Sequence, residues 1–440
     1  MTTIEPSGVE GSNCPTNERD QFIPVRKADL LDALIEHGPL GSEAEREKFR
    51  QVCRLLAAIY HHEYFDLLER LRHDYFYFNP ELDPHARFDE AAQEAAYADL
   101  LDSFTTVLKH ANFIEMSHAE VEQAHRERKV MRVEVEAPID DFRDVRFFRR
   151  GHHHETVETA TWLGLRKETH DVVVYDDLVL FVAMKPEAQI ASRRRKRRLE
   201  QRKIRTGSVL IKYFRNIAAK DLNALFPNVR VVMSTFDKLS LSVPALAGGI
   251  PILINLASTI TVLFLVIGFY LGLVAAVEED HLKKAFAAMS GLAALGGFIL
   301  RQWLRYQAQS LKYHKELTDN IYYRNVNNNA GIFDYIIGAA EDQECKEAFL
   351  AYYFLRIAKS APTQAELEGK IETWLRETFG VDLEFEVGDA LAKLDRFALL
   401  RRDGERLRVP TPEATLARLD EVWASFFPFE VESPATAAEA

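Results

Sequence analysis

The sequence predicts an α+β membrane protein in three parts: a helical plus antiparallel-sheet amino-terminal domain, a two-helix transmembrane hairpin and a winged-helix-like carboxy-terminal domain. The first observation is a run without any charged residue from Leu239 to Val277. The second is a helical apolar spacing before residue 127, which changes to strict alternation from Val130. The third is a series of three predicted helices followed by a tight hairpin signal near the carboxyl end.

The composition limits the class of protein. The chain has 440 residues, of which 47% are hydrophobic and 28% are charged, and its formal net charge is −12. This mixture excludes a wholly disordered or collagen-like chain, and the acidic excess argues against wholesale nucleic-acid binding. The three cysteines, Cys14, Cys53 and Cys345, lie far apart, which excludes a disulfide scaffold and suits a reducing compartment.

The amino-terminal part is predicted to be a disordered tail followed by helices. Residues 1–20 are acidic and lack an apolar run, so we expect a disordered tail without a targeting signal. Residues 21–127 form a helical region, with a capping-box spacing at Ser117 and Glu120. A long helix that opens at Ser42 has one apolar face at helical spacing, made of Phe49, Val52, Cys53, Leu56, Ile59, Tyr60 and Tyr64.

Residues 128–240 form the predicted sheet region, because apolar and polar residues alternate there with a period of two. The strand-like runs are 144–148, 156–165, 172–175 and 178–184. Alternation with hairpin-like connections favours an antiparallel sheet.

A basic run occupies residues 193–205 and holds nine cations against the single acid Glu200. Its members are Arg193, Arg194, Arg195, Lys196, Arg197, Arg198, Arg202, Lys203 and Arg205. Close to a membrane, such a cluster is expected to contact anionic lipid headgroups. The alternatives are a solvated loop and a nucleic-acid contact, and the absence of interleaved aromatic residues disfavours single-stranded nucleic acid.

Residues 241–304 contain the predicted transmembrane hairpin, with spans at 252–277 and 285–304. The first span is about 39 Å long at about 1.5 Å per residue, which exceeds the roughly 30 Å hydrocarbon layer. A buried hairpin in a soluble protein is the alternative. Small residues at a spacing of four predict close helix packing at Gly268 with Gly272 and at Ala287 with Gly291.

The placement of lysine and arginine sets the expected orientation. The short turn between the spans carries more acids than lysines, and both flanks carry lysine or arginine. We therefore expect an integral membrane protein with both termini cytoplasmic.

The part after the hairpin is predicted to begin with a connecting helix and an Asn-rich turn at 305–340. Residues 341–427 show the order of a winged helix: a helix, a capped helix from Thr363 to Gly380, a third helix near 387–397 and a hairpin at Asp403-Gly404. Residues 341–440 hold 12 lysines and arginines against 21 acids. We therefore expect this domain to contact a protein partner and expect no specific DNA binding. Residues 428–440 are predicted to be a second disordered tail.

The sequence shows none of the common local signatures of catalysis, such as HExxH, GxGxxG, a P-loop, GxSxG or CxxC. His61 and His62 are adjacent on a helix and point to different sides. His152, His153 and His154 are expected in a solvent-exposed loop. No catalytic residue, metal ligand or cofactor is therefore predicted, and an enzyme whose site is assembled by folding stays possible.

Several separated segments carry a family resemblance. They are VLIKYFRNIAAKDLNALFPNVRVVMSTFDKLSLSVPALAGGI (209–250), YYRNVNNNAGIFDYIIGAAEDQECKEAFLAYYFL (322–355), DALAKLDRFALL (389–400) and QFIPVRKADLL (21–31). In these segments the chain resembles the transmembrane protein 143 family, a family of unknown function, over roughly residues 20–427. The resemblance implies a membrane protein with a paired transmembrane segment. Eukaryotic members are associated with mitochondria, whereas the acidic amino end here lacks a targeting signal and favours the bacterial cytoplasmic (inner) membrane. It implies no catalytic residues.

The leading functional hypothesis is a membrane-anchored homo-oligomeric scaffold or regulator with two cytoplasmic domains. One alternative is an oligomeric channel or transport assembly built from several hairpins. The other is a membrane-anchored hydrolase or lipid-acting enzyme in the amino-terminal domain. The expected partners are membrane lipids, a second copy of the chain and a protein that binds the carboxy-terminal domain.

Overall fold

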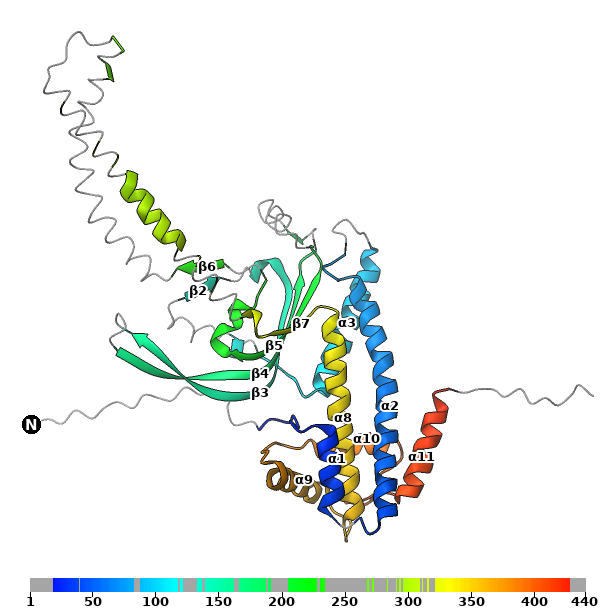
Figure 1. Ribbon diagram of the computed structural model, residues 1–440. Coiled ribbons are helices and arrows are strands. Elements are labelled where there is room, and N and C mark those ends of the chain that lie inside the picture. Colours follow the sequence, from blue (N-terminus) through cyan, green and yellow to red (C-terminus); the bar gives the residue numbers. More distant parts are fainter. Residues whose placement is uncertain are drawn as a thin grey trace, which may run out of the picture.

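The computed structural model combines a bundle of helices with an antiparallel sheet (Figure 1). It describes residues 19–38, 40–82, 88–117, 119–121, 133–136, 139–161, 166–186, 189–190, 205–227, 230–233, 267–268, 271–272, 283, 290, 293, 296–308, 311, 315 and 321–427. Two of the predicted parts, the tail at 428–440 and residues 1–18 of the first tail, lie outside these ranges.

The helices begin and end at local sequence signals. α1 (Lys27–His37), α2 (Glu43–Phe76) and α3 (Glu90–His110) come first, and α8 (Gly331–Ile357), α9 (Gln364–Phe379), α10 (Val387–Arg396) and α11 (Pro412–Ser425) come last. Ser42 caps α2 by accepting a hydrogen bond from the Glu45 N–H, and Thr363 with Glu366 forms the predicted capping box of α9. The seven apolar positions predicted for α2 are all buried.

The main sheet has the order β1-β3-β4-β5-β7, with all neighbours antiparallel. Its strands are β1 (Ile114–Glu115), β3 (Phe142–Thr161), β4 (Arg166–Met184), β5 (Val209–Ala218) and β7 (Asn325–Asn328). The 310 helices η1 (Ile139–Asp141) and η3 (Ala219–Ala224) flank it. Two further pairs stand apart: β2 (Val133–Glu136) with β6 (Arg230–Met233), and β8 (Arg401–Asp403) with β9 (Arg406–Arg408).

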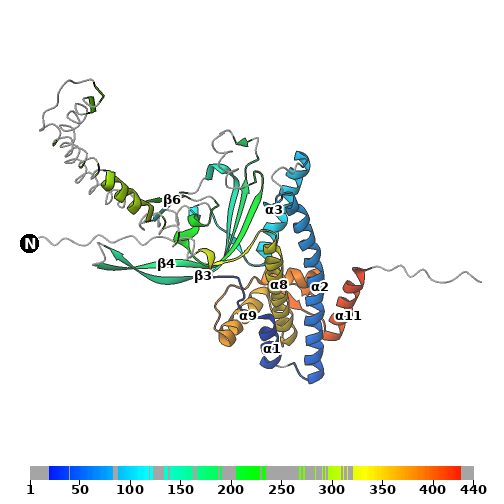
Figure 2. The same cartoon turned by 45° about the horizontal axis from the view of Figure 1, so that its top comes forward.

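Both faces of the sheet are covered, because side chains alternate along each strand. On β4, Val179, Phe181 and Ala183 belong to the large core shared with the helices. Their neighbours Leu178 and Leu180 belong to a second core with η3. β3 and β4 continue past β5 as a two-stranded ribbon that projects away from the helices (Figures 1 and 2).

The prediction of an integral membrane protein is wrong on the residues that the structure describes. Among them, no helix has the length and apolar character needed to cross a membrane. Within the predicted span 252–277, Leu271 and Gly272 form a turn, and Gly272 has a φ of +75°. A glycine adopts this left-handed conformation at little cost, so it allows a turn at this position of the predicted span. Most of the first predicted span, 252–277, lies outside the described residues. Of the second predicted span, 285–304, residues 296–304 are described and are helical.

This finding also removes the bacterial inner-membrane localisation and the paired-span part of the predicted fold class. What stands is an α+β fold with an antiparallel sheet. In residues 341–427 the predicted order of helices and hairpin is present as α8, α9, α10 and β8–β9.

Candidate functional site

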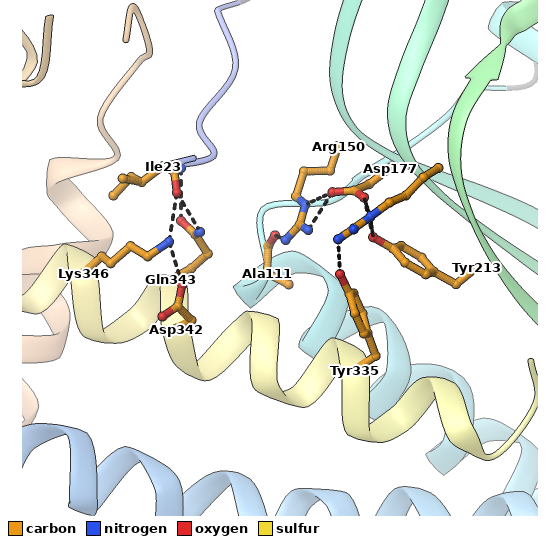
Figure 3. Close-up of polar contacts among 10 residues, drawn as sticks. Ile23, Ala111, Arg150, Asp177, Tyr213, Tyr335, Asp342, Gln343 and Lys346 are labelled. Carbon is orange, nitrogen blue, oxygen red and sulfur yellow. Dashed lines mark hydrogen bonds and ion pairs between the residues drawn. The ribbon is translucent and has the colours of Figure 1, made fainter. Parts of the chain in front are cut away.

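A buried ion pair lies where the sheet meets the helices. Arg150 of β3 and Asp177 of β4 are register partners, and the guanidinium donates through Nε and Nη2 to Oδ2 of the aspartate at 3.0 and 2.7 Å. Its Nη1 donates to the carbonyl of Ala111, just after α3, at 3.1 Å. Figure 3 shows the two side chains face to face. Both are almost fully buried, so each depends on the other for charge compensation.

The same aspartate is connected to α8 through Arg215. Its second oxygen, Oδ1, accepts hydrogen bonds from the Tyr213 hydroxyl and from Nε of Arg215 on β5. Arg215 also donates to the hydroxyl of Tyr335 on α8, and the rings of Tyr213 and Tyr335 lie 4.7 Å apart (Figure 3). Burial and the nearby Asp177 carboxylate raise the pKa of Tyr213, so its hydroxyl stays protonated as a donor.

A segment that we call the strap, residues 19–25, runs without helix or strand across this junction. The Ile23 N–H donates to Oε1 of Gln343 at 3.1 Å, and Nε2 of Gln343 donates back to the Ile23 carbonyl at 3.2 Å. Lys346 donates to the same carbonyl at 2.9 Å and forms an ion pair with Asp342 at 2.6 Å (Figure 3). Side chains from one turn of α8 therefore hold the strap backbone through hydrogen bonds.

Three more elements hold the strap before Ile23. Nδ2 of Asn112, just after α3, donates to the Gln21 carbonyl at 2.8 Å. The backbone N–H of Glu384 donates to the Asp20 carbonyl at 3.1 Å. Arg19 pairs with Glu372 of α9 at 3.0 Å. Arg19 and Asp20, the last two residues of the predicted tail 1–20, thus contact the folded part of the chain.

The strap side chains occupy defined positions. The Phe22 ring lies 4.2 Å from the guanidinium of Arg150 and 5.6 Å from the ammonium of Lys346, so it contacts two cations. Ile23 is fully buried in the helical core.

A second cluster of charges lies beside the strap, between α8 and α10. Lys393 contacts three carboxylates: Glu347 most closely, Asp389 at 2.9 Å and Glu344 at 3.0 Å. Asn112 connects this cluster to the strap, because its amide also donates to Oε1 of Glu347 at 3.3 Å.

The electrostatics of this cluster are unusual. Burial raises the pKa of Glu347 to about 7 even though Lys393 opposes the shift, and burial also raises the pKa of Glu344. Burial disfavours the charged ammonium, but the surrounding carboxylates prevail and raise the pKa of Lys393. Burial and Lys393 lower the pKa of His110, whose Nδ1 lies 2.8 Å from the Tyr64 hydroxyl. Burial therefore favours the protonated forms of Glu344 and Glu347, whereas the carboxylates favour the charged form of Lys393.

The carboxylates of this cluster have the ligand set of a cation site. Within the part of the chain that the structure describes, Glu344, Glu347 and Asp389 are the one group of three that could hold a metal ion. Lys393 already contacts all three carboxylates. The cluster therefore compensates the charge of a buried lysine inside the fold.

The predicted histidine loop is wrong, because His152, His153 and His154 lie on β3. His153 pairs with Asp176 at 2.6 Å, and His154 pairs with Asp171 at 2.9 Å. Neighbouring strand residues point to opposite faces, so adjacent histidines cannot converge on one ion.

A helix at 296–308, drawn in yellow-green in Figure 1, exposes large apolar side chains. They are Ile299, Leu300, Trp303, Leu304 and Tyr306, each between 48% and 58% exposed.

The residues predicted for lipid contact fall mainly outside the described ranges, which hold only Arg205 of the basic run. Arg205 is buried, donates to the Asn79 carbonyl at 3.0 Å and lies 5.6 Å from the Phe88 ring. Of the small residues predicted for helix packing, Ala287 and Gly291 lie outside the described residues. Gly268 is helical, and a Cβ added at Gly272 would meet no atom within 4 Å.

Sequence reasoning missed the strap and its partners. The available signal was a polar stretch, Gln343 to Glu347, inside an otherwise apolar helix. Gln343, Lys346 and Glu347 stand at helical neighbour spacing and are all buried. A buried helix face that carries polar residues must find polar partners, although the sequence does not say where they lie.

The comparisons with known proteins concern the sheet and the start of α8. Residues 175–331 match the family described as Protein of unknown function (DUF3754). This range includes Asp177, Tyr213 and Arg215 of the junction. No solved structure matches the chain.

Proposed function

We propose that this chain is a scaffold or regulator that self-associates through helix 296–308. The observation that carries the proposal is the set of five large apolar side chains exposed on this one short helix. A contiguous apolar patch in contact with water is unfavourable, and in soluble proteins such patches commonly mark interaction sites.

The spacing on the helix supports pairing with a second copy. Ile299 and Trp303 are four residues apart, and so are Leu300 and Leu304, so the four side chains form one stripe. Two identical stripes can cover one another about a two-fold axis, which is the commonest symmetry of soluble oligomers.

The charged groups of the candidate site support a binding role over chemistry on a substrate. Arg150 and Asp177 compensate each other, and Lys393 is neutralised by the carboxylates around it. The first pair joins two strands of the sheet, Arg215 joins the sheet to Tyr335 of α8, and Lys393 joins α8 to α10. A scaffold requires this kind of rigid body.

The experiment compares the molar mass of three full-length chains by light scattering over a range of concentrations. The wild type is expected to exceed the single-chain mass of 50.3 kDa increasingly as concentration rises. Trp303→Glu combined with Leu304→Glu is expected to remain at the single-chain mass. Phe65→Glu is the control, because Phe65 is similarly exposed, at 52%, but lies on α2.

A wild type that stays at the single-chain mass throughout, or a double variant that associates as strongly as the wild type, would refute self-association through this helix. We also propose kinship with the transmembrane protein 143 family, because its motif segments 209–250 and 322–355 overlap the matched range 175–331.

A further inference from the structure

The contacts of the strap are those of a bound peptide. Its backbone forms hydrogen bonds with the side chains of three residues, namely Gln343, Lys346 and Asn112. Gln343 satisfies both the N–H and the carbonyl of Ile23, a pairing that depends on backbone position and not on side-chain identity. Gln343 and Lys346 are only 1% and 2% exposed, so both bind the strap from inside the fold.

We call the residues that bind the strap, namely Arg150, Asn112, Gln343 and Lys346, the groove. The surroundings of the strap also contact its side chains. Phe22 fits against Arg150 and Lys346, and Ile23 enters the core. Arg19 lies at an acidic rim, 3.0 Å from Glu372 and 3.8 Å from Asp382. The chemistry recognised is therefore a basic residue, two residues held by their backbone, an aromatic residue and an aliphatic residue.

The strap can leave the groove without breaking a helix or a sheet. None of its residues belongs to a strand, and α1 begins only at Lys27. The first backbone hydrogen bond of α1 runs from the Leu30 N–H to the carbonyl of Arg26, its N-cap, and therefore does not include a residue of the strap. Release costs the hydrogen bonds and the burial of Phe22 and Ile23, all of which an equivalent segment restores.

We propose that the groove of α8, formed by Arg150, Asn112, Gln343 and Lys346, is a binding site for an extended segment of a partner protein with the pattern basic-x-x-aromatic-aliphatic. The strap is its internal occupant and competes with the partner. This site is separate from helix 296–308 and does not rest on self-association.

The test uses the full chain with the groove vacated by Phe22→Ser and Ile23→Ser. The probe is a fluorescent peptide of residues 17–27, NERDQFIPVRK, titrated by anisotropy. Saturable binding to the vacated chain is expected. The wild type, whose strap fills the groove, is expected to bind at least tenfold more weakly, because the strap is present at a high effective concentration.

Three controls define the site. Adding Gln343→Leu to the vacated chain should abolish binding, because the two bonds to the peptide backbone are lost. The peptide NERDQSSPVRK should not bind. Adding Trp303→Glu and Leu304→Glu should leave binding unchanged, which separates this site from the self-association helix.

Circular dichroism shows whether the vacated chain is folded. If it is not, the milder Phe22→Ala chain takes its place and is expected to bind the peptide more weakly but saturably. A folded chain of either kind that fails to bind the peptide, or that binds it equally after Gln343→Leu, would overturn the proposal.

Discussion

Gln343 and Ile23 exchange two hydrogen bonds across 320 positions of the sequence, and both residues are buried. The carboxamide of Gln343 serves the backbone of Ile23 in the way that a neighbouring strand would. This relationship ties the amino-terminal strap to the middle of α8. Because an unpaired backbone group inside a protein costs about 1–3 kcal/mol, the pair is energetically important.

Gln343→Leu is therefore expected to lower the free energy of unfolding by about 2–4 kcal/mol, since it leaves the Ile23 N–H unpaired and weakens the bonding of the Ile23 carbonyl. Urea denaturation measures the change. Gln51→Leu, at an exposed position of α2, is the control and should change it by less than about 0.5 kcal/mol. Equal effects of the two variants would contradict a stabilising role of the two buried hydrogen bonds between Gln343 and Ile23.

Asp177→Ala is expected to cost about 3–5 kcal/mol, because it leaves the buried guanidinium of Arg150 without its counter-charge. Asp171→Ala is the matched control on the same strand. Asp171 is exposed and pairs with His154, so its removal should cost less than about 1 kcal/mol. A comparison of denaturation midpoints tests the difference, and similar midpoints for the two variants would argue against a buried ion pair.

Gly151→Ala is expected to destabilise the fold more than Gly380→Ala. Both glycines have a positive φ, of +69° and +68°, so both substitutions carry a conformational cost of about 1 kcal/mol. Only at Gly151 would the new Cβ also meet a side chain, at 2.5 Å from Oδ2 of Asp176, which adds roughly 1–3 kcal/mol. At Gly380 the space is open. Equal melting temperatures for the two variants would show that Asp176 moves aside freely.

Glu347 should make stability depend on pH. Burial raises its pKa from 4.5 to about 7, so between these values the folded chain holds a proton that the unfolded chain has released. The contribution of Glu347 to the free energy of unfolding therefore falls as pH rises through this window. In the Glu347→Gln variant the dependence disappears, and the melting temperature of the variant relative to wild type should rise from pH 5 to pH 8. Glu377→Gln, at an exposed position of α9, should run parallel to wild type. Parallel curves for Glu347→Gln as well would place the titration elsewhere.

Local signals predicted much of the helical part of the fold. Thr363 and Glu366 form the expected capping box, Gly380 ends α9 in a left-handed conformation, and Gly404 has the positive φ of a tight hairpin. Each of these features depends on residues within a few positions of one another, so the local sequence is sufficient to predict it.

The wrong predictions concern places where a backbone conformation or a contact between distant residues determines the structure. Gly151 adopts a positive φ and lets one long strand continue through the histidines, where the sequence suggested two strands and a loop. Gly272 forms a turn inside the run that hydropathy reads as one span. The contact between Ile23 and Gln343 has no local signature, so the strap and the groove could not be predicted.

Cysteine cross-linking tests self-association through helix 296–308 most directly. In a Cys14→Ser chain, a cysteine introduced as Gln307→Cys lies one turn beyond Trp303 and Leu304 on the same stripe, while Gln51→Cys on α2 serves as control. Mild oxidation is expected to yield a covalent dimer from the Gln307→Cys chain and little from the Gln51→Cys chain. A Gln307→Cys chain that stays monomeric, or equal dimer yields at the two positions, would contradict the account.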